Sequence, residues 1–364
     1  MIDPKVIALY LPQFHQIPEN DLFWGDGFTD WVSVKNARPL FPGHQQPRVP
    51  LNHNYYDLSE EKHVVWQASL AKKYGIYGFG VYHYWFNNEK NLLTKPAEIM
   101  RDNDKVESKY FFIWDNNNWI RSWSNVQGND WAPIADAENT CGPAILIPYI
   151  LGEKKDWEMH YRYLSSHFKS KRYIKMAGKP VFCIFSYSDN LIEMCDYWNR
   201  LSQDDGFEGI HFVFKNPVYR NRKIPNEFSK YSYDPIFRVS FLKRVARKLH
   251  LMPPASISFY DYDVLWNRLI TNARKHPELT FYPCAFVAFD DTPRRGRQKA
   301  RVIIGATPEK FEKYFKNLYS ISKEQNKEFI FLTAWNEWGE GAFIEPDEMN
   351  GYKYLEIIQR VTKE

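Results

Sequence analysis

Two glutamates, Glu337 and Glu340, lie three residues apart shortly after an apolar run. The run, residues 329–334, has the composition of a buried strand in a parallel sheet. In barrels of parallel strands, catalytic side chains lie at the strand ends. Residues three apart in a turn or a first helical turn can face one cavity. The pair could therefore act on a glycosidic bond, where one carboxyl group gives a proton and the other takes a proton or stabilises positive charge.

Aromatic and amide side chains surround this pair, because Trp335, Asn336 and Trp338 are its neighbours in the sequence. Indole rings offer flat faces on which sugar rings can stack, and an amide can hydrogen-bond to sugar hydroxyl groups. Aromatic residues make up 17% of the chain, a content that fits a platform for weakly charged, flat ligands. Burial in the core is the equal alternative for each Trp.

Further polar and aromatic residues follow the other predicted strands. We expect six of them to contact the substrate around the same cavity: Tyr10, His15, His83, Asn116, Trp119 and Asp290. For His83 the alternative is a structural histidine held by a hydrogen bond. For Asp290 the alternative is a cap of the turn before Pro293. Glu345 is a weaker third carboxylate, with a solvated loop as its alternative.

Strand-like runs alternate with amphipathic helices along the chain. The predicted strands occupy residues 6–11, 76–82, 110–114, 181–185, 210–214, 281–288 and 329–334, and residues 145–151 are a candidate for another. This alternation predicts an α/β fold, a (β/α)8 TIM-type barrel with long strand-to-helix loops, formed by residues 1–364 as one domain. A doubly wound open sheet is the alternative, but no Gly-x-Gly-x-x-Gly motif follows the first strand.

Two segments depart from the repeating pattern. The connection 12–57 has no secondary-structure pattern, which favours a functional loop or a lid. Residues 217–254 are basic and predict an excursion over the barrel mouth. This stretch could bind an anionic glycan or a lipid-linked phosphate, with a solvated face as the alternative. Its basic residues are Arg220, Arg222, Lys223, Lys243, Arg244, Arg247 and Lys248.

Composition narrows the class of ligand. The balance of 48 basic and 44 acidic residues gives a net charge of +4, too small to indicate nucleic acid. No apolar run is long enough to span a membrane and no signal peptide precedes the first strand, so we expect a cytoplasmic protein without an integral membrane segment. We expect no metal or cofactor, because zinc-type clusters and a Walker loop are missing. No nucleophile elbow indicates an esterase. Asp261 and Asp263 have the spacing of metal-dependent transferases, but a lone pair is a weak signal.

Six short segments form an ordered set between Val6 and Leu355. They are 10–15 (YLPQFH), 27–31 (GFTDW), 38–44 (RPLFPGH), 82–86 (YHYWF), 291–295 (DTPRR) and 334–341 (AWNEWGEG), with Glu345 and Pro346 following. Together they resemble the WbsX-type proteins of bacterial polysaccharide clusters, which are similar to glycoside hydrolase family 99. Motifs of this length, in order over nearly the whole chain, are a specific signal.

The resemblance implies a (β/α)8 barrel that cleaves glycosidic bonds with retention. It also implies that Glu337 assists the 2-hydroxyl of the substrate as a base and that Glu340 is the general acid. The spacing alone leaves a direct carboxylate nucleophile open. One position departs from the family pattern, because Asn117 stands where a glutamate is usual. This departure puts substrate specificity or activity in doubt, and Asp115 is a candidate to compensate.

Three functions remain as hypotheses. The first is a retaining, metal-independent glycosidase acting on a bacterial surface polysaccharide or its precursor. The second is a glycosyltransferase or transglycosylase of lipopolysaccharide or capsule biosynthesis, which would use the same carboxylates on an activated donor. The third is a barrel that binds glycans without catalysis. This hypothesis rests on Asn117, which stands where the resemblance implies a glutamate.

Overall fold

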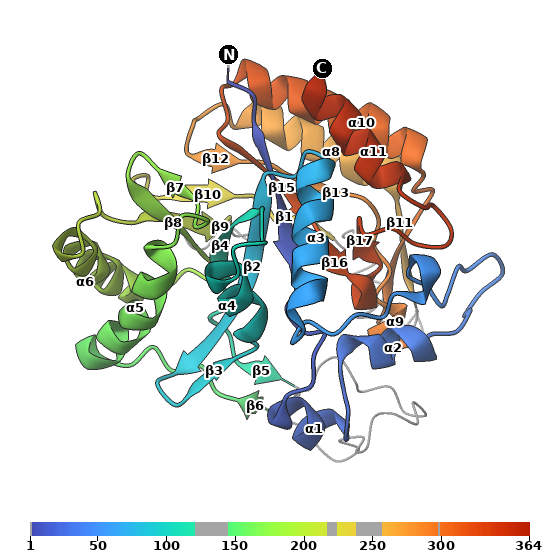
Figure 1. The fold of residues 1–364 in the computed structure, drawn as a ribbon. Coiled ribbons are helices and arrows are strands. Elements are labelled where there is room, and N and C mark those ends of the chain that lie inside the picture. The colour runs from blue at the N-terminus through green and yellow to red at the C-terminus, as the bar shows by residue number, and fades with distance from the viewer. Residues whose placement is uncertain (1, 121–144, 217–223, 238–256, 298) are drawn as a thin grey trace, which may run out of the picture.

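Parallel strands pair around a ring at the centre of the molecule (Figure 1). The computed structural model describes residues 2–120, 145–216, 224–237, 257–297 and 299–364. In order around the ring, the strands are β12 (Phe281–Tyr282), β10 (Ser229–Tyr231), β9 (His211–Lys215), β8 (Lys179–Ile184), β4 (Lys109–Trp114), β2 (Gly78–Asn87), β1 (Lys5–Tyr10), β15 (Phe329–Thr333) and β13 (Cys284–Phe286).

The ring closes through the short segment 281–286. Its first half, β12, pairs with β10, and its second half, β13, pairs with β15. Pro283 separates the two halves, and its carbonyl accepts a hydrogen bond from Phe331 at 2.9 Å. Proline has no N–H to donate to a sheet, so it interrupts the pairing locally. Counting 281–286 as one strand, the described residues form the parallel barrel that the alternation predicted, and the open-sheet alternative is wrong.

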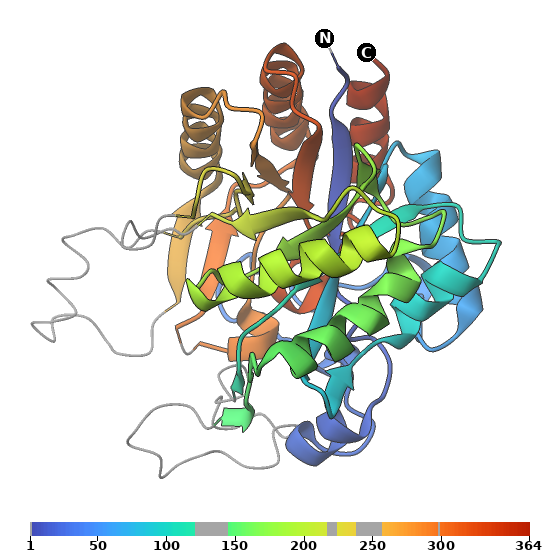
Figure 2. The ribbon, with the colours of Figure 1, turned by 90° about the vertical axis from the view of Figure 1, so that its left-hand side faces the viewer.

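Helices cover the outside of this barrel (Figures 1 and 2). They are α3 (Glu61–Lys73), α4 (Lys95–Asp102), α5 (Lys154–Phe168), α6 (Asn190–Asp204), α8 (Tyr262–Lys275), α10 (Pro308–Glu324) and α11 (Lys353–Lys363). The start of α10 follows from its sequence, because the Thr307 side chain accepts a hydrogen bond from the Lys310 backbone and Pro308 occupies the first position. Its apolar residues, such as Phe311 and Leu318, are fully buried.

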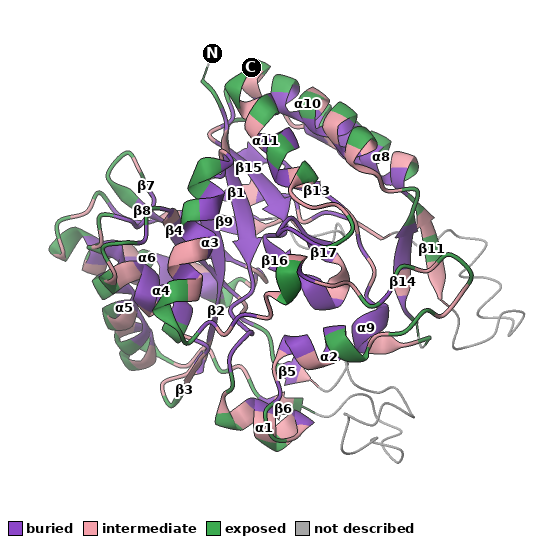
Figure 3. Cartoon of the chain, turned by 45° about the vertical axis from the view of Figure 1, so that its right-hand side comes forward, coloured by how far each residue is buried: buried purple, intermediate pink, exposed green. Residues whose placement is uncertain are grey.

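The strands of the barrel consist largely of buried residues, drawn purple in Figure 3, and aromatic side chains are prominent among them. The rings of Tyr231 and Phe331 stack with their centroids 4.7 Å apart, and the ring of Phe111 lies 5.8 Å from that of Phe331. The interior is therefore packed, and chemistry must take place at the strand ends. In the described ranges, no helix is long and apolar enough to cross a membrane.

The structure corrects three expectations about the elements. The connection 12–57 contains α1 (Pro18–Trp24), α2 (Asp30–Asn36) and the 3-10 turn η1 (Leu51–His53), so it is not free of secondary structure. The strand expected to end at residue 82 continues to Asn87 and forms a hairpin with β3 (Lys90–Leu92). Within 145–151, β6 (Ile145–Ile147) pairs only with β5 (Trp119–Ile120), outside the barrel.

The region 217–254 contains a barrel strand. Strand β10 lies within it, although only three residues pair and one of them is Lys230. Three residues are too few for a periodic pattern, which explains why the strand was not predicted. Residues 217–223 and 238–256, with the seven basic residues named above, lie outside the described residues, and so does the predicted excursion.

Shorter elements complete the described chain: β7 (Lys175–Met176), β11 (Ser258–Asp261), α9 (Thr292–Arg295), β14 (Arg301–Ile304), β16 (Asn336–Glu337), η2 (Trp338–Glu340) and β17 (Ala342–Phe343).

Candidate active site

The two glutamates lie in a tight hairpin beyond the end of β15. Strand β16 pairs with β17, and the single turn η2 connects them. The amide of Asn336 fixes this hairpin to the end of β1, because it accepts a hydrogen bond from the Leu11 backbone at 2.7 Å and donates one to the Leu11 carbonyl at 2.9 Å. Asn336 is therefore occupied by the backbone, and it holds the glutamate hairpin at the carboxyl end of the barrel.

Arg294 brings Glu337 and Glu340 together. One terminal nitrogen, Nη2, lies 3.1 Å from Glu337 Oε2, and the other, Nη1, lies 3.0 Å from Glu340 Oε1. The arginine belongs to the short helix α9 that follows β13. Both carboxylates thus face one guanidinium.

Asp30 orients this guanidinium from the opposite side. Its two oxygens accept hydrogen bonds from Arg294 Nε and Nη2 at 3.1 Å each, the two-pronged geometry in which Arg binds a carboxylate best. The backbone N–H of Gly339 also donates to Asp30, at 3.1 Å. A Cβ atom on Gly339 would lie 2.5 Å from Arg294 Nε and 2.7 Å from an Asp30 oxygen. Glycine is therefore required for this close approach.

Burial distinguishes the two glutamates. The side chain of Glu337 is 7% exposed and that of Glu340 is 24% exposed. Burial raises the pKa of Glu337 to about 8; Arg294 opposes this shift, while the charges of Glu340 and Asp30 add to it. Burial also disfavours the charge of Arg294, but the three carboxylates outweigh burial and raise the pKa of this guanidinium.

Tyrosines from two separate parts of the barrel, strand β2 and the segment just after β10, lie near the carboxylates. Tyr82 and Tyr233 share a hydrogen bond of 2.9 Å between their hydroxyl groups. Burial raises the pKa of both phenols, and the nearby charge of Glu337 raises it further. Burial also raises the pKa of Tyr84, two residues after Tyr82, and the charges of Asp115 and Glu337 add to this shift. These hydroxyl groups can donate to a carboxylate or to a sugar oxygen.

A second pair of charged groups lies at the ends of β4 and β9. Burial raises the pKa of Asp115, whereas a hydrogen bond from Asn117 at 2.6 Å opposes that shift. Burial lowers the pKa of Lys215 to about 8, and the Asp115 charge opposes that shift. The Lys215 ammonium lies over the Phe185 ring, 3.0 Å from its centroid. Asn117, where the family usually has glutamate, is exposed and also accepts from Ser186 at 2.8 Å.

The structure places three of the expected contact residues away from the carboxylates. The Tyr10 hydroxyl donates to Gln67 of α3 at 2.7 Å. His83 Nε2 lies 2.8 Å from His160 Nε2 of α5, because side chains alternate along β2 and Tyr82 and Tyr84 take the inward positions. Asn116 exchanges hydrogen bonds with the Ser186 backbone at 2.8 Å. For His83 this contact is that of the structural alternative, and for Tyr10 and Asn116 it replaces the expected contact with substrate.

Asp290 lies beside the hairpin, where its backbone N–H donates to the Glu340 carbonyl at 2.6 Å, whereas His15 lies in the loop after β1. Asp290 accepts hydrogen bonds from His44 at 2.7 Å, Gln46 at 2.8 Å and the Thr292 hydroxyl at 2.6 Å, so it also closes the turn before Pro293. Burial works against its ionised form, yet these bonds hold its pKa below the ordinary value. His15 is buried, and burial lowers its pKa.

The three tryptophans differ in their surroundings. Trp335 is fully buried. Trp338 is 1% exposed, stacks on Phe343 with centroids 3.6 Å apart and donates to Glu345 at 2.7 Å. Neither indole offers a free face to a sugar. Trp119 packs edge-on against Tyr84, with centroids 5.5 Å apart, and so lies beside the carboxylate cluster.

Glu345 forms a separate buried centre behind the hairpin. It accepts hydrogen bonds from Tyr56, Gln67 and Trp338 at 2.7 Å each. Burial raises its pKa to about 7, and the hydrogen bonds oppose that shift. The solvated-loop alternative for Glu345 is wrong, because the residue is only 3% exposed. In the part of the chain that the structure describes, no group of three or more His, Cys, Asp or Glu side chains is arranged to hold a metal ion.

Several residues of the cluster were not predicted as site residues. Asp30 and Arg294 lie within segments that carried the family resemblance, but nothing in their spacing indicated that they meet. Tyr82 and Lys215 had a signal in the sequence, since each lies at or next to the end of a predicted strand. Asp115, which follows another predicted strand, was a candidate only to compensate for Asn117. Tyr233 follows the unpredicted strand β10.

Comparisons with known proteins concern the family and the fold. Residues 6–358 match the family model described as Glycosyltransferase WbsX. The uncharacterized protein WxcX of Xanthomonas campestris pv. campestris is 28% identical in strain B100, over 98% of this chain and 49% of the relative, and 29% identical in strain ATCC 33913, over the same shares. The chain thus spans about half the length of these relatives.

Solved structures share the fold. The GH99 endo-alpha-mannosidase from Bacteroides thetaiotaomicron superposes with a TM-score of 0.55 at 15% identity, over 100% of this chain and 97% of that one. A glycoside hydrolase-like protein superposes with a TM-score of 0.59 at 12% identity, over 99% and 94% of the two chains. At such identities the likeness concerns the fold alone. The family model covers nearly the whole chain, and this protein therefore belongs to the WbsX family.

Proposed function

We propose that this protein is a retaining, metal-independent glycosidase that acts on a bacterial surface polysaccharide or its precursor. The observation that carries the proposal is the placement of Glu337 and Glu340 on one guanidinium at the carboxyl end of a barrel strand. One carboxyl group is buried and the other is partly open, so the two have different environments. Such a difference is typical of carboxylate pairs that divide acid and base roles.

The division of roles follows the family resemblance. Glu340 donates a proton to the glycosidic oxygen while Glu337 takes the proton of the sugar 2-hydroxyl. The freed oxygen attacks the anomeric carbon, and the bond to the leaving sugar breaks. In the second step Glu340 takes a proton from water, the water oxygen attacks the anomeric carbon, and Glu337 returns its proton to the 2-oxygen. A carboxyl group whose pKa is raised is a stronger base towards a hydroxyl group.

The test uses the producing organism's own surface polysaccharide, with α-linked mannans as a second substrate because of the structural neighbours. Products are read by mass spectrometry for the wild type, Glu340→Gln and the control Glu356→Gln, which alters an exposed residue of α11. We expect oligosaccharides from the wild type and the control only. Equal release by Glu340→Gln would contradict the assignment of the acid. A substrate lacking the 2-hydroxyl should resist cleavage if that group is the nucleophile, and should be cleaved if Glu337 attacks directly.

Sugar transfer is the second candidate, and the description of the family favours it. The same carboxylates would serve, with a sugar hydroxyl in place of water in the second step. Incubation with a glycan donor and an excess of an acceptor sugar separates the two functions. Elongated products that exceed hydrolysis products would favour transfer. Binding of a nucleotide sugar would favour a glycosyltransferase that uses an activated donor.

A further inference from the structure

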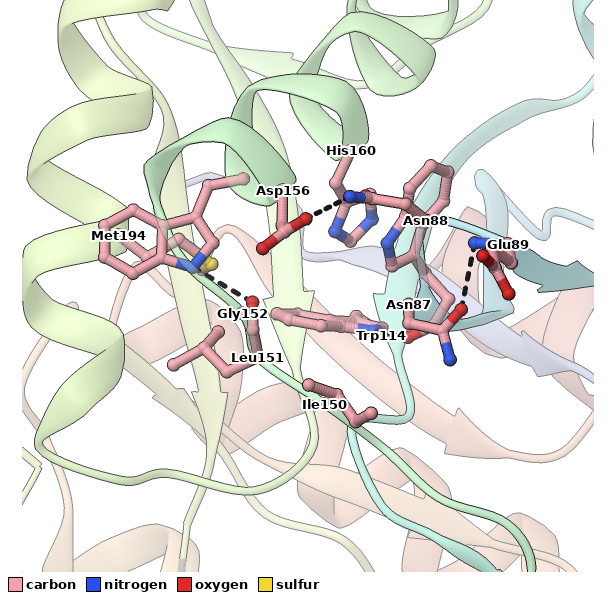
Figure 4. A pocket seen from close by; sticks show the side chains of 12 residues that line it. Asn87, Asn88, Glu89, Trp114, Ile150, Leu151, Gly152, Asp156, His160 and Met194 are labelled. Atoms are coloured by element: carbon pink, nitrogen blue, oxygen red, sulfur yellow. Dashed lines mark hydrogen bonds between the residues drawn. The ribbon is translucent and has the colours of Figure 1, made fainter.

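A cavity of about 340 Å³ lies behind the outer end of β2, between this strand and helices α5 and α6 (Figure 4). Its volume is at the lower end of the range for small-molecule sites, about 300–1,000 Å³. Trp85 belongs to its wall, whereas the preceding residue, Tyr84, points towards the carboxylate cluster. Successive side chains of a strand point to opposite faces. The cavity is therefore separated from Glu337 and Glu340 by the thickness of β2.

Aromatic rings in fixed positions form much of the wall. The Trp85 indole stacks on His160 with ring centroids 4.3 Å apart and planes within 5°. Trp114 donates to the Trp85 carbonyl at 2.9 Å, and Trp157 donates to the Leu151 carbonyl at 3.0 Å. The N–H groups of Trp114 and Trp157 are thus satisfied by the backbone, and the Trp85 ring is held by its stack on His160. Rigid aromatic walls suit a ligand with both apolar faces and hydroxyl groups.

One polar group at the cavity is without a partner. The Asn88 amide nitrogen donates to Asp156, and because an ionised carboxylate only accepts hydrogen bonds, this contact fixes which amide atom is the oxygen. That oxygen, Oδ1, is buried and accepts no hydrogen bond from any described residue. A buried acceptor without a donor is costly. A hydroxyl group of a bound ligand would supply the donor.

The charge of the wall selects among ligands. The titratable side chains among its described residues are Glu89, Asp156 and His160, and none is Lys or Arg. Burial lowers the pKa of His160, so this ring is neutral. An anionic sugar would meet two carboxylates without a cation to pair with. The cavity therefore favours an uncharged, hydroxyl-rich ligand.

We propose that this cavity binds a neutral sugar unit, as a second carbohydrate site distinct from the carboxylate cluster. The Asn88 oxygen accepts from a sugar hydroxyl, and the indoles of Trp85, Trp114 and Trp157 border the ring. The choice of a glycan as the source of that unit rests on the proposed function. The lining and the unpaired oxygen do not depend on it.

The probes are methyl α-glycosides of mannose, glucose and galactose, titrated against the Glu340→Gln protein and followed by saturation-transfer NMR and Trp fluorescence. Asn88→Leu removes the unpaired oxygen at similar size. Ile150→Trp narrows the cavity at a lip residue that is 55% exposed. Asn267→Leu makes the same chemical change as Asn88→Leu on the exposed face of α8. Thermal unfolding of each variant shows that the fold is retained.

We expect at least one glycoside to bind saturably, about tenfold more weakly in Asn88→Leu and Ile150→Trp, and unchanged in Asn267→Leu. Equal binding by all variants, or no binding of any of the three glycosides, would overturn the proposal. Cleavage of polysaccharide without glycoside binding would reject the second site and leave the glycosidase intact. Binding that depends on Asn88 without any cleavage would support the site while the proposed catalysis failed.

Discussion

Asp30 and Arg294 lie 264 residues apart in the sequence and form a two-pronged ion pair, with both contacts at 3.1 Å. The far side of the same guanidinium faces Glu337 and Glu340. One cation is therefore shared by three carboxylates, two of which are almost fully buried. Asp30 sets the orientation of Arg294, and Arg294 in turn sets the distance between the two glutamates.

Arg294→Gln should destabilise the protein strongly and in a manner that depends on pH. Without the cation, burial and the charges of Glu340 and Asp30 raise the pKa of Glu337 unopposed, so this carboxyl group holds its proton in the folded state at a pH where the unfolded chain has lost it. Stability is then lost as pH rises above the ordinary range of carboxyl groups. We expect a loss of about 3–5 kcal/mol at pH 7 and a smaller one at pH 4, measured by urea unfolding.

The control for this change is Arg295→Gln. Arg295 also pairs with a buried carboxylate, Asp291, but that carboxylate retains Arg301 at 2.8 Å. A small loss, similar at both pH values, is expected. If Arg294→Gln were destabilised equally at pH 4 and pH 7, the charge of Glu337 would not depend on this arginine.

Gly339→Ala should reduce turnover by roughly a hundredfold. The new Cβ would lie 2.5 Å from Arg294 Nε and within 2.8 Å of both Asp30 oxygens, so the ion pair must shift and carry the glutamates with it. The measurement is kcat on the substrate that the cleavage experiment identifies, together with unfolding by urea. Gly206→Ala is the control, because its φ of +85° strains a side chain while nothing lies within 4 Å of the added atom. Similar losses of turnover in both variants would argue against the close approach as the cause.

The sequence predicted the barrel because its strands are long apolar runs, and it predicted the pair of glutamates because they follow the last of those runs. It could not predict how far β2 extends. The segment 82–86 is aromatic throughout, so it reads the same whether it is paired or not. Pairing through Asn87 fixes the alternation that turns Tyr82 and Tyr84 inward and His83 outward. A shift of one residue would have exchanged these faces.

The role of Arg294 could not be predicted for a different reason. One of its partners, Asp30, lies 264 residues earlier in the sequence, and another, Glu337, lies 43 residues later. Only closure of the barrel brings these residues together. Charges at such separations leave no periodic signal. Asn336 was predicted to contact the substrate because its amide is next to a catalytic candidate. In the structure that amide is hydrogen-bonded to the Leu11 backbone instead.

Glu345→Gln should flatten the pH dependence of stability. Burial raises the pKa of Glu345 to about 7, so its contribution is complete below the ordinary glutamate pKa and is lost as pH rises towards 7. The size of this loss is on the order of 3 kcal/mol. Unfolding by urea from pH 4 to pH 8 should show a smaller decline for Glu345→Gln than for the wild type. Parallel curves would mean that Glu345 ionises in the folded protein as it does in the unfolded chain. Glu348→Gln, in the same loop but exposed, is the control.

The pH dependence of kcat/KM should reveal the role of Glu337. Burial raises its pKa to about 8, and a base must lose its proton before it can accept one. If Glu337 is the base, kcat/KM rises with pH and levels off near pH 8, because kcat/KM reports the ionisation of the free enzyme. If Glu337 is instead the acid, kcat/KM falls through the same range, and Glu340 becomes the candidate base.

Activity of Glu337→Gln towards a substrate with a good leaving group, rescued by added azide or formate, would identify direct attack by Glu337 on the anomeric carbon. No rescue, with loss of cleavage when the 2-hydroxyl is removed, would identify that hydroxyl as the nucleophile and Glu337 as its base.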